Sequence, residues 1–240
     1  MTIDTNTSRL SNRARFRGPV IEAGLRHYML SVYNYMAVGL GLTGLVAAIA
    51  AGSGFYEQIA GTPLIWLVML APLAAVLFLS FLIERMSFAT AQTVFWVYAG
   101  LMGLSFAGIL LVYTGTSVAR VFFISAGTFA AMSLYGYSTG RDLSRFGSFL
   151  FMGLVGIILA SVVNIFVASS MLHFTISMIG VLVFTGLTAY DTQRIKEIYF
   201  TDRGSIDLAK LGLSGALTLY LDFINLFLML LQLTGERRER

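Results

Sequence analysis

Residues 211–233 form the stretch LGLSGALTLYLDFINLFLMLLQL, which is apolar almost throughout and contains a single charged residue, Asp222. About 20 apolar residues in a helix span the roughly 30 Å hydrocarbon core of a bilayer, so this stretch predicts a transmembrane helix. The same criterion, applied toward the N-terminus, finds six more such stretches. The seven predicted helices cover residues 28–51, 62–83, 87–113, 118–137, 147–168, 173–193 and 211–233.

The composition favours the same class of protein. The chain is 57% hydrophobic and only 12% charged, with a mean hydropathy of +0.80, whereas about a quarter of a typical soluble domain is charged. We therefore predict an all-α membrane protein with seven transmembrane helices. Its expected parts are a cytoplasmic basic tail (1–27), a membrane domain (28–234) and a charged C-terminal tail (235–240).

The residue content excludes several kinds of site. Without cysteine there is no disulfide framework, thiolate nucleophile or Cys-based zinc site. A net charge of +4 could suggest a nucleic-acid partner, but the basic residues are scattered over the segments that flank apolar stretches. That distribution is typical of membrane orientation, so no nucleic acid is expected.

The basic residues also predict the orientation. They gather in the N-terminal tail and after the second, fourth and sixth helices, which places these segments and the N-terminus in the cytoplasm. They are Arg9, Arg13, Arg15, Arg17 and Arg26, then Arg85, then Arg141 and Arg145, then Arg194, Lys196, Arg203 and Lys210.

Seven crossings place the basic C-terminus, residues 237–240, on the opposite side, so the sequence leaves open whether the last segment crosses fully. Residues 1–27 are expected to form an arm without fixed structure that sets the orientation, or one that lies on the anionic leaflet. The polar residues 194–210 predict the only long loop.

Glycines within the predicted helices suggest close helix packing. Small residues let helix backbones approach in lipid, where no hydrophobic effect drives helices together. Gly39, Gly41 and Gly44 in the first helix, and Gly100 and Gly103 in the third, are expected to serve this purpose.

The last helix carries a polar stripe. A charged side chain at mid-helix costs on the order of 3 kcal/mol on insertion, so Asp222 demands a functional or structural reason. The stripe should face the protein interior or a water-filled cavity, although the hydroxyl groups can also serve only as hydrogen-bonding links. Its members are Ser214, Thr218, Asp222, Asn225 and Gln232, of which Ser214, Thr218 and Asn225 are the pore-lining candidates.

Asp191, near the end of the sixth predicted helix, is the second carboxylate of interest. It is either a solvated boundary residue or a partner of Asp222. Two carboxylates that meet in a poorly hydrated site share a proton and form a pH sensor, and when both are ionised they suit Ca²⁺. A nearby arginine would compete with that cation, and Arg85 and Arg141 are the candidates.

Two segments of this region strongly resemble the Bax inhibitor-1 family, namely YDTQRI at 190–195 and LYLDFINLF at 219–227. The segments YNYM at 33–36 and YGYSTGRDL at 135–143 support the resemblance, which covers nearly the whole membrane domain. The compact form is similar to that of bacterial members, which implies the inner membrane.

The resemblance implies six helices around a central C-terminal helix and a pH-sensitive calcium leak. It also implies that Asp191 and Asp222 are the two-aspartate pH sensor and that Arg85 is the latching arginine. Ca²⁺ and H⁺ would be the ligands, membrane lipids the surroundings, and no cofactor is expected.

Other functions remain open or are disfavoured. A regulator of a membrane complex, such as a membrane-bound protease, would use the N-terminal tail and residues 194–210 as contacts. An intramembrane aspartyl protease is disfavoured because Asp222 follows Leu-Tyr-Leu rather than Gly-x-Gly. A retinal protein needs a lysine within the bundle, but Lys196 and Lys210 lie in or beside a predicted loop. We therefore expect no enzymatic activity.

Overall fold

The computed structural model describes residues 5–201 and 208–238, and within these ranges the chain folds into helices. Seven of the helices are long and apolar enough to cross a membrane, as the sequence predicts. The bounds are α1 Thr5–Gly52, α2 Phe55–Ala60, α3 Leu64–Leu82, the 3₁₀ helix η1 Ile83–Arg85, α4 Phe88–Val112, α5 Gly115–Ser138, α6 Ser144–Val167, α7 Ser170–Thr201 and α8 Leu208–Thr234.

Local sequence explains several helix ends. The Ser87 hydroxyl accepts a hydrogen bond from the Thr90 amide at 3.2 Å and caps α4, and Thr114 caps α5 in the same way. The short helix α2 follows Gly54, whose φ of 71° lies in the left-handed region that glycine adopts freely. Pro63 precedes α3, where its missing N–H costs nothing.

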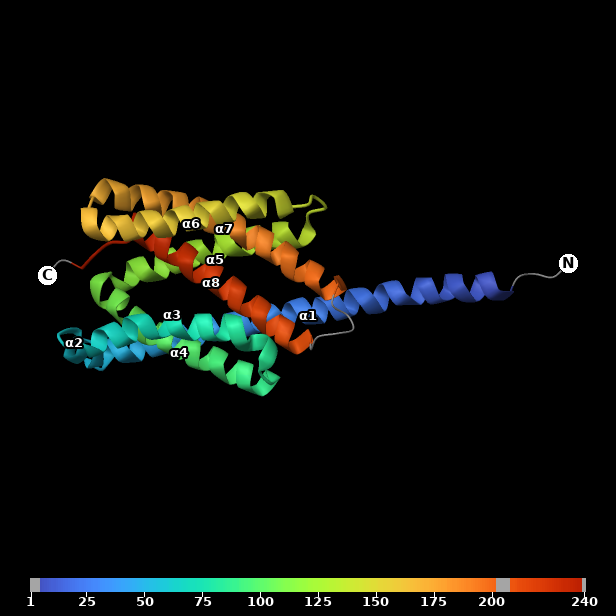
Figure 1. Cartoon of the computed structure of the whole chain (residues 1–240), viewed down its shortest axis with the longest axis horizontal. Coiled ribbons are helices and arrows are strands. Elements are labelled where there is room, and N and C mark those ends of the chain that lie inside the picture. The colour runs from blue at the N-terminus through green and yellow to red at the C-terminus, as the bar shows by residue number, and fades with distance from the viewer. Residues whose placement is uncertain (1–4, 202–207, 239–240) are drawn as a thin grey trace.

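Two segments depart from the sequence-based expectation. Residues 5–20, expected as an arm, continue α1 as a helix that projects beyond the other helices (Figure 1). The helix α7 runs to Thr201, so the predicted loop 194–210 is wrong over its first eight residues, Arg194 and Lys196 among them. Arg203, placed in the same loop, lies outside the described residues.

The helix α8 is the most buried of the seven spans. In its apolar 18-residue stretch 56% of the residues are buried, compared with 39% in the same length of α7 and 6% in that of α6. It packs against α1, α4, α5 and α7, and Figure 1 shows it crossing between the α6–α7 pair and the α3–α4 pair. The helices α3 and α6 lie further out, against α4 and α7.

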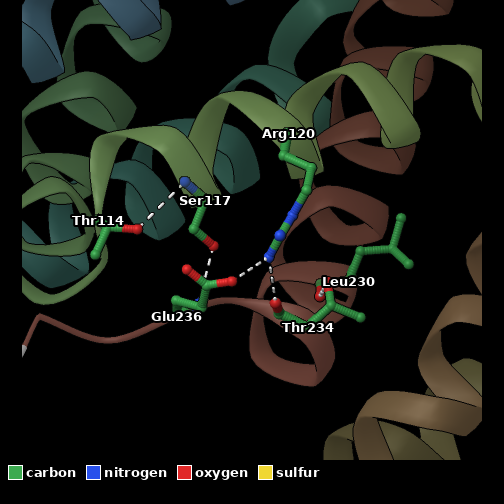
Figure 2. A network of polar contacts seen from close by, with 6 residues as sticks. All are labelled: Thr114, Ser117, Arg120, Leu230, Thr234 and Glu236. Carbon is green, nitrogen blue, oxygen red and sulfur yellow. Dashed lines mark hydrogen bonds and ion pairs between the residues drawn. The ribbon is translucent and has the colours of Figure 1, made fainter.

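The contacts of the segment after α8 show at which end of the bundle this helix finishes. The Thr114 amide donates to the Glu236 carbonyl and the Arg238 amide donates to the Val112 carbonyl, both at 2.9 Å. Arg120 forms a 2.9 Å ion pair with Glu236 (Figure 2). Since the α4–α5 connection lies at the far end of the bundle from the start of α8, α8 runs the full length of the bundle (Figure 1).

Only some of the glycines predicted to allow close helix packing lie at such contacts. A Cβ at Gly103 would lie 2.7 Å from the Thr43 carbonyl oxygen, and one at Gly39 would lie 3.0 Å from the Phe95 ring. These two predictions are confirmed. A Cβ at Gly41, Gly44 or Gly100 would meet no atom within 4 Å, so the prediction of close packing is wrong there.

Candidate functional site

Asp191 and Asp222 meet between α7 and α8. Their exposed fractions are 9% and 5%, and the two carboxyl groups are close enough to share a hydrogen bond. The fully enclosed Oδ2 of Asp222 is without a hydrogen-bond partner in the described part of the chain. The structure thus brings together the two carboxylates that the sequence singles out.

Both aspartates lie well inside their helices. Asp222 follows Leu208, the start of α8, by about 14 residues or 21 Å, and Asp191 precedes the end of α7 by about 10 residues or 15 Å. The alternative that Asp191 is a solvated boundary residue is therefore wrong, because its helix continues past residue 193.

The pair lies on the wall of a cavity of about 1070 Å³ between α6, α7 and α8, here called the aspartate cavity. Along α6 it extends from Gly147 to Ile165, about 27 Å of helix. Among the described residues that line it, Asp191, Arg194 and Asp222 carry charge. The helix α8 contributes Thr218, Leu221, Asp222, Asn225 and Met229.

The arginine that lines the aspartate cavity is Arg194, and the expected latch Arg85 does not line it. Arg194 follows Asp191 by three residues on α7, attracts it electrostatically and lines the same cavity. Arg85 is exposed at the end of η1 and does not line this cavity, and Arg141 is exposed in the α5–α6 connection. The spacing of residues 191 and 194 is the signal that could have revealed this neighbour, had α7 been extended.

The polar stripe of α8 divides into two parts. Thr218 donates to the Ser214 carbonyl at 3.2 Å, and Asn225 donates to the Leu221 carbonyl at 2.8 Å, so both cavity-lining side chains bond to their own helix. Ser214 does not line the aspartate cavity. Gln232 accepts a 2.9 Å hydrogen bond from Ser177. Asp222 is the member of the stripe that is left with an unsatisfied buried oxygen.

Residues around Asp191 fasten α7 to its neighbours. Thr192 shares a 3.0 Å hydrogen bond with Ser133 of α5, and Ser133 shares one of 2.5 Å with Tyr33 of α1. A Cβ at Gly136 would overlap the Ala189 backbone, so α5 and α7 touch at this level. The helix α5 therefore holds the part of α7 that carries Asp191 by contacts on both sides of this residue.

Gln193 holds the connection between α5 and α6. Its Nε2 donates to the Arg141 carbonyl and its Oε1 accepts from the Leu143 amide, both at 2.8 Å. On the next face of α7, the Tyr190 ring packs so closely on Gly147 of α6 that a Cβ there would overlap it. The segment 190–193 thus contacts α5, the α5–α6 connection, α6 and α8 with four consecutive side chains.

The chain matches the family model described as inhibitor of apoptosis-promoting Bax1 over residues 25–239, a range that includes Asp191, Arg194 and Asp222. The protein belongs to the Bax inhibitor-1 family. This confirms the resemblance found in segments 190–195 and 219–227. The family is not a known class of enzyme.

Bacterial relatives of this Bax inhibitor-1 family member match it over nearly their whole length. A protein of Rickettsia prowazekii (strain Madrid E) is 51% identical over 225 residues, which are 93% of this chain and 95% of the relative. The inner membrane protein YbhL of Escherichia coli (strain K12) is 49% identical over 220 residues, 90% and 94% of the two chains. The protein is thus a multi-pass membrane protein of a bacterial type.

Proposed function

We propose that this Bax inhibitor-1 family member is a Ca²⁺ leak channel of the bacterial inner membrane whose permeability is set by protons at Asp191 and Asp222. The observation that carries the proposal is the meeting of two buried carboxyl groups, from different helices, on the wall of the aspartate cavity. Such groups are costly within a bilayer, on the order of 3 kcal/mol each, so their pairing at a cavity indicates a functional site.

The gating step follows from the chemistry of the pair. With one shared proton, the two carboxyl groups form a hydrogen bond that joins α7 to α8. Loss of that proton leaves two negative charges in contact, which either repel each other or recruit a cation. Protons and Ca²⁺ therefore compete for the same oxygens, and Ca²⁺ flux should rise as the pH rises.

The set of oxygen donors suits a passing ion. Ca²⁺ takes six to eight oxygen ligands and tolerates irregular geometry. The two carboxylates, the Thr218 hydroxyl and the Asn225 amide line one cavity, and water would complete the shell. In the described ranges there is no group of three or more acidic, histidine or cysteine side chains that could hold a resident metal. In this proposal Ca²⁺ is the transported ion.

The test is Ca²⁺ flux into liposomes that contain the purified full chain and a trapped fluorescent indicator, measured across pH. The variants Asp191→Asn and Asp222→Asn should each abolish the pH dependence, because an amide neither ionises nor shares the proton. Absence of flux at every pH, or unchanged profiles in both variants, would refute the channel.

The matched control is Asp142→Asn, which alters an aspartate in the α5–α6 connection. Asp142 accepts a 2.8 Å hydrogen bond from the Ser144 amide, and the hydrogen bonding from Ser144 lowers the pKa of its carboxyl group below the usual value. It therefore stays ionised across the neutral range, so its replacement should leave the pH profile unchanged.

A second variant addresses Arg194, which competes with Ca²⁺ for Asp191. Arg194 is exposed and attracts Asp191 electrostatically. An exposed charge pair contributes about 0.2–1 kcal/mol, so Arg194→Gln should lower the half-saturating Ca²⁺ concentration by at most about fivefold. Arg145→Gln, which alters an exposed arginine at the start of α6, is its control.

A regulator that binds a membrane protein complex is the second candidate. It is favoured by the N-terminal part of α1, which extends from the bundle as a helix (Figure 1). Deletion of residues 1–20 should then remove the partners recovered by crosslinking in cells while Ca²⁺ flux persists. Recovery of the same partners would exclude this contact surface.

A further inference from the structure

A second hollow region lies on another side of α8, between α1 and α5. Both helices pack against α8, and three cavities of about 550, 450 and 300 Å³ follow one another between them. The first two share Met36 and Phe129, and the second and third share Leu40, Gly44, Phe122 and Phe223. The three neighbouring cavities are together called the α1–α5 groove here.

The α1–α5 groove has the length of a membrane leaflet and more. Its lining begins at Arg26 and reaches Gly44 in the second cavity, about 18 residues or 27 Å along α1. Arg26 lies directly before the apolar stretch of α1, residues 28–51. A long arginine at this depth can place its guanidinium group among the lipid headgroups.

The walls are apolar and the space in front of them is open. Ala37, Gly41 and Gly44 line the second cavity on α1, and Ala126 faces them from α5. A Cβ at Gly41 or Gly44 would meet no atom within 4 Å, so these glycines border empty space and not a packed helix. A flexible hydrocarbon chain can fill this space without displacing any protein atom.

Apart from Thr43 in the third cavity, the polar groups of the α1–α5 groove gather at one end. Among the described residues of its lining, Arg26 is the only charged one, and Tyr33, Ser133 and Tyr137 add hydroxyl groups in the same cavity. Lys196 lies 5.1 Å from the centre of the Tyr137 ring and brings a second positive charge to this end. A positive end that continues into an apolar trough complements an anionic headgroup joined to a hydrocarbon chain.

We propose that the α1–α5 groove binds one anionic phospholipid, with its phosphate at Arg26 and one acyl chain along Ala37, Gly41 and Gly44. A second copy of this chain is the other occupant of suitable shape. The charge distribution favours the lipid, because only a molecule with one anionic end and a long apolar remainder matches both parts of the lining. This site is separate from the aspartate cavity and is independent of the proposed channel.

The first test measures lipid retention by native mass spectrometry of the full chain, released from micelles with added phosphatidylglycerol or phosphatidylcholine. One phosphatidylglycerol should stay bound, and phosphatidylcholine should be retained less. A basic residue contributes about 1 kcal/mol to the binding of anionic lipid, so Arg26→Gln should weaken phosphatidylglycerol retention about fivefold, and the control Arg145→Gln should not. Equal retention of both lipids, or no difference between the two variants, would overturn the proposed headgroup site.

The second test places a bulky side chain in the α1–α5 groove. Gly44→Leu places a side chain in the α1–α5 groove and should abolish retention of both lipids. The control is Gly127→Leu, at a glycine of α5 where a Cβ also meets nothing within 4 Å and which lines none of the three cavities. Unchanged lipid retention in Gly44→Leu would refute the acyl-chain site, and conversion of a dimer to a monomer would assign the groove to a second copy instead.

A readout without mutation guards against a variant that fails to fold. Phosphatidylglycerol with a diazirine in its acyl chain, photolysed with the wild-type protein in vesicles, should label peptides that contain residues 37–45 or 122–130. Labelling spread evenly over all seven spans would contradict a bound lipid.

Discussion

Asp222 and Phe223 are consecutive residues of α8, yet they border different chambers. Asp222 lies on the wall of the aspartate cavity, whereas Phe223 lines the α1–α5 groove and packs edge-on against Phe122 and Phe129. Consecutive residues point about 100° apart around a helix of 3.6 residues per turn. The central helix thus separates a chamber with three charged lining residues from one that is charged only at its end.

The difference shows that one helix serves two kinds of surroundings. On the cavity side, the Asp222 carboxyl group lies against the Asp191 carboxyl group, with which it can share a proton, and Arg194 lines the same cavity. On the groove side, three aromatic rings fill the corresponding space, with centroid distances of 5.6 and 5.7 Å from Phe223 to Phe122 and Phe129. The neighbours, and not the average composition of α8, decide what each face can carry.

The largest effect on stability is expected when a carboxyl group is placed on the groove side of α8. Phe223→Asp moves a carboxyl group to the groove side, where no described cation faces it, and should destabilise the protein by roughly 3 kcal/mol. Asp222→Leu removes a buried charge and should be neutral or stabilising. Thermal unfolding in lipid nanodiscs measures both. Comparable losses of stability in the two variants would break the contrast between the chambers.

An intermediate effect is expected from two glycines. Gly136→Ala forces a Cβ into the Ala189 backbone and should cost about 1–3 kcal/mol, because a backbone contact cannot yield. Gly44→Ala, at the open α1–α5 groove, should stabilise α1 by about 0.5–1 kcal/mol. Opposite shifts of the unfolding midpoint are the expected result, and shifts of the same sign would show that the groove is packed.

The smallest effect concerns the hydrogen bonds that link the two chambers. Tyr33 and Ser133 line the α1–α5 groove, and Ser133 bonds to Thr192, the neighbour of Asp191. Thr192→Val should cost about 0.6 kcal/mol, and up to about 1.7, as for other hydrogen bonds between membrane helices. A double-mutant cycle with Ser133→Ala measures the coupling, and strict additivity would mean that the bond contributes nothing.

Much of the fold could be predicted because membrane insertion depends on each helix separately. A run of about 20 apolar residues is recognisable without knowledge of its neighbours, and all seven spans were found in this way. The spacing on α8 likewise placed Thr218, Asp222 and Asn225 on one face, and the structure puts all three on the aspartate cavity. The cytoplasmic side of the N-terminus stays a prediction.

The errors arose where contacts join distant parts of the chain. Polarity after residue 193 suggested a loop, but α7 continues because Gln193 and Lys196 bond to backbone carbonyls at the end of α5 and in the α5–α6 connection. The same error concealed Arg194, and the role expected of Arg85 stays a prediction. Glycine spacing could not distinguish Gly39, which faces Phe95, from Gly41, which faces open space.

By itself, the sequence determined that this chain is a seven-span membrane protein of the Bax inhibitor-1 family with two aspartates of special interest. Those properties reside in local composition and in motifs of a few residues. Only the tertiary structure decided that the aspartates meet, that Arg194 lines their cavity, that α8 runs the full length of the bundle and that a groove lies between α1 and α5. The physical reason is that helix faces within a bilayer are matched by packing and hydrogen bonding between residues far apart in the chain.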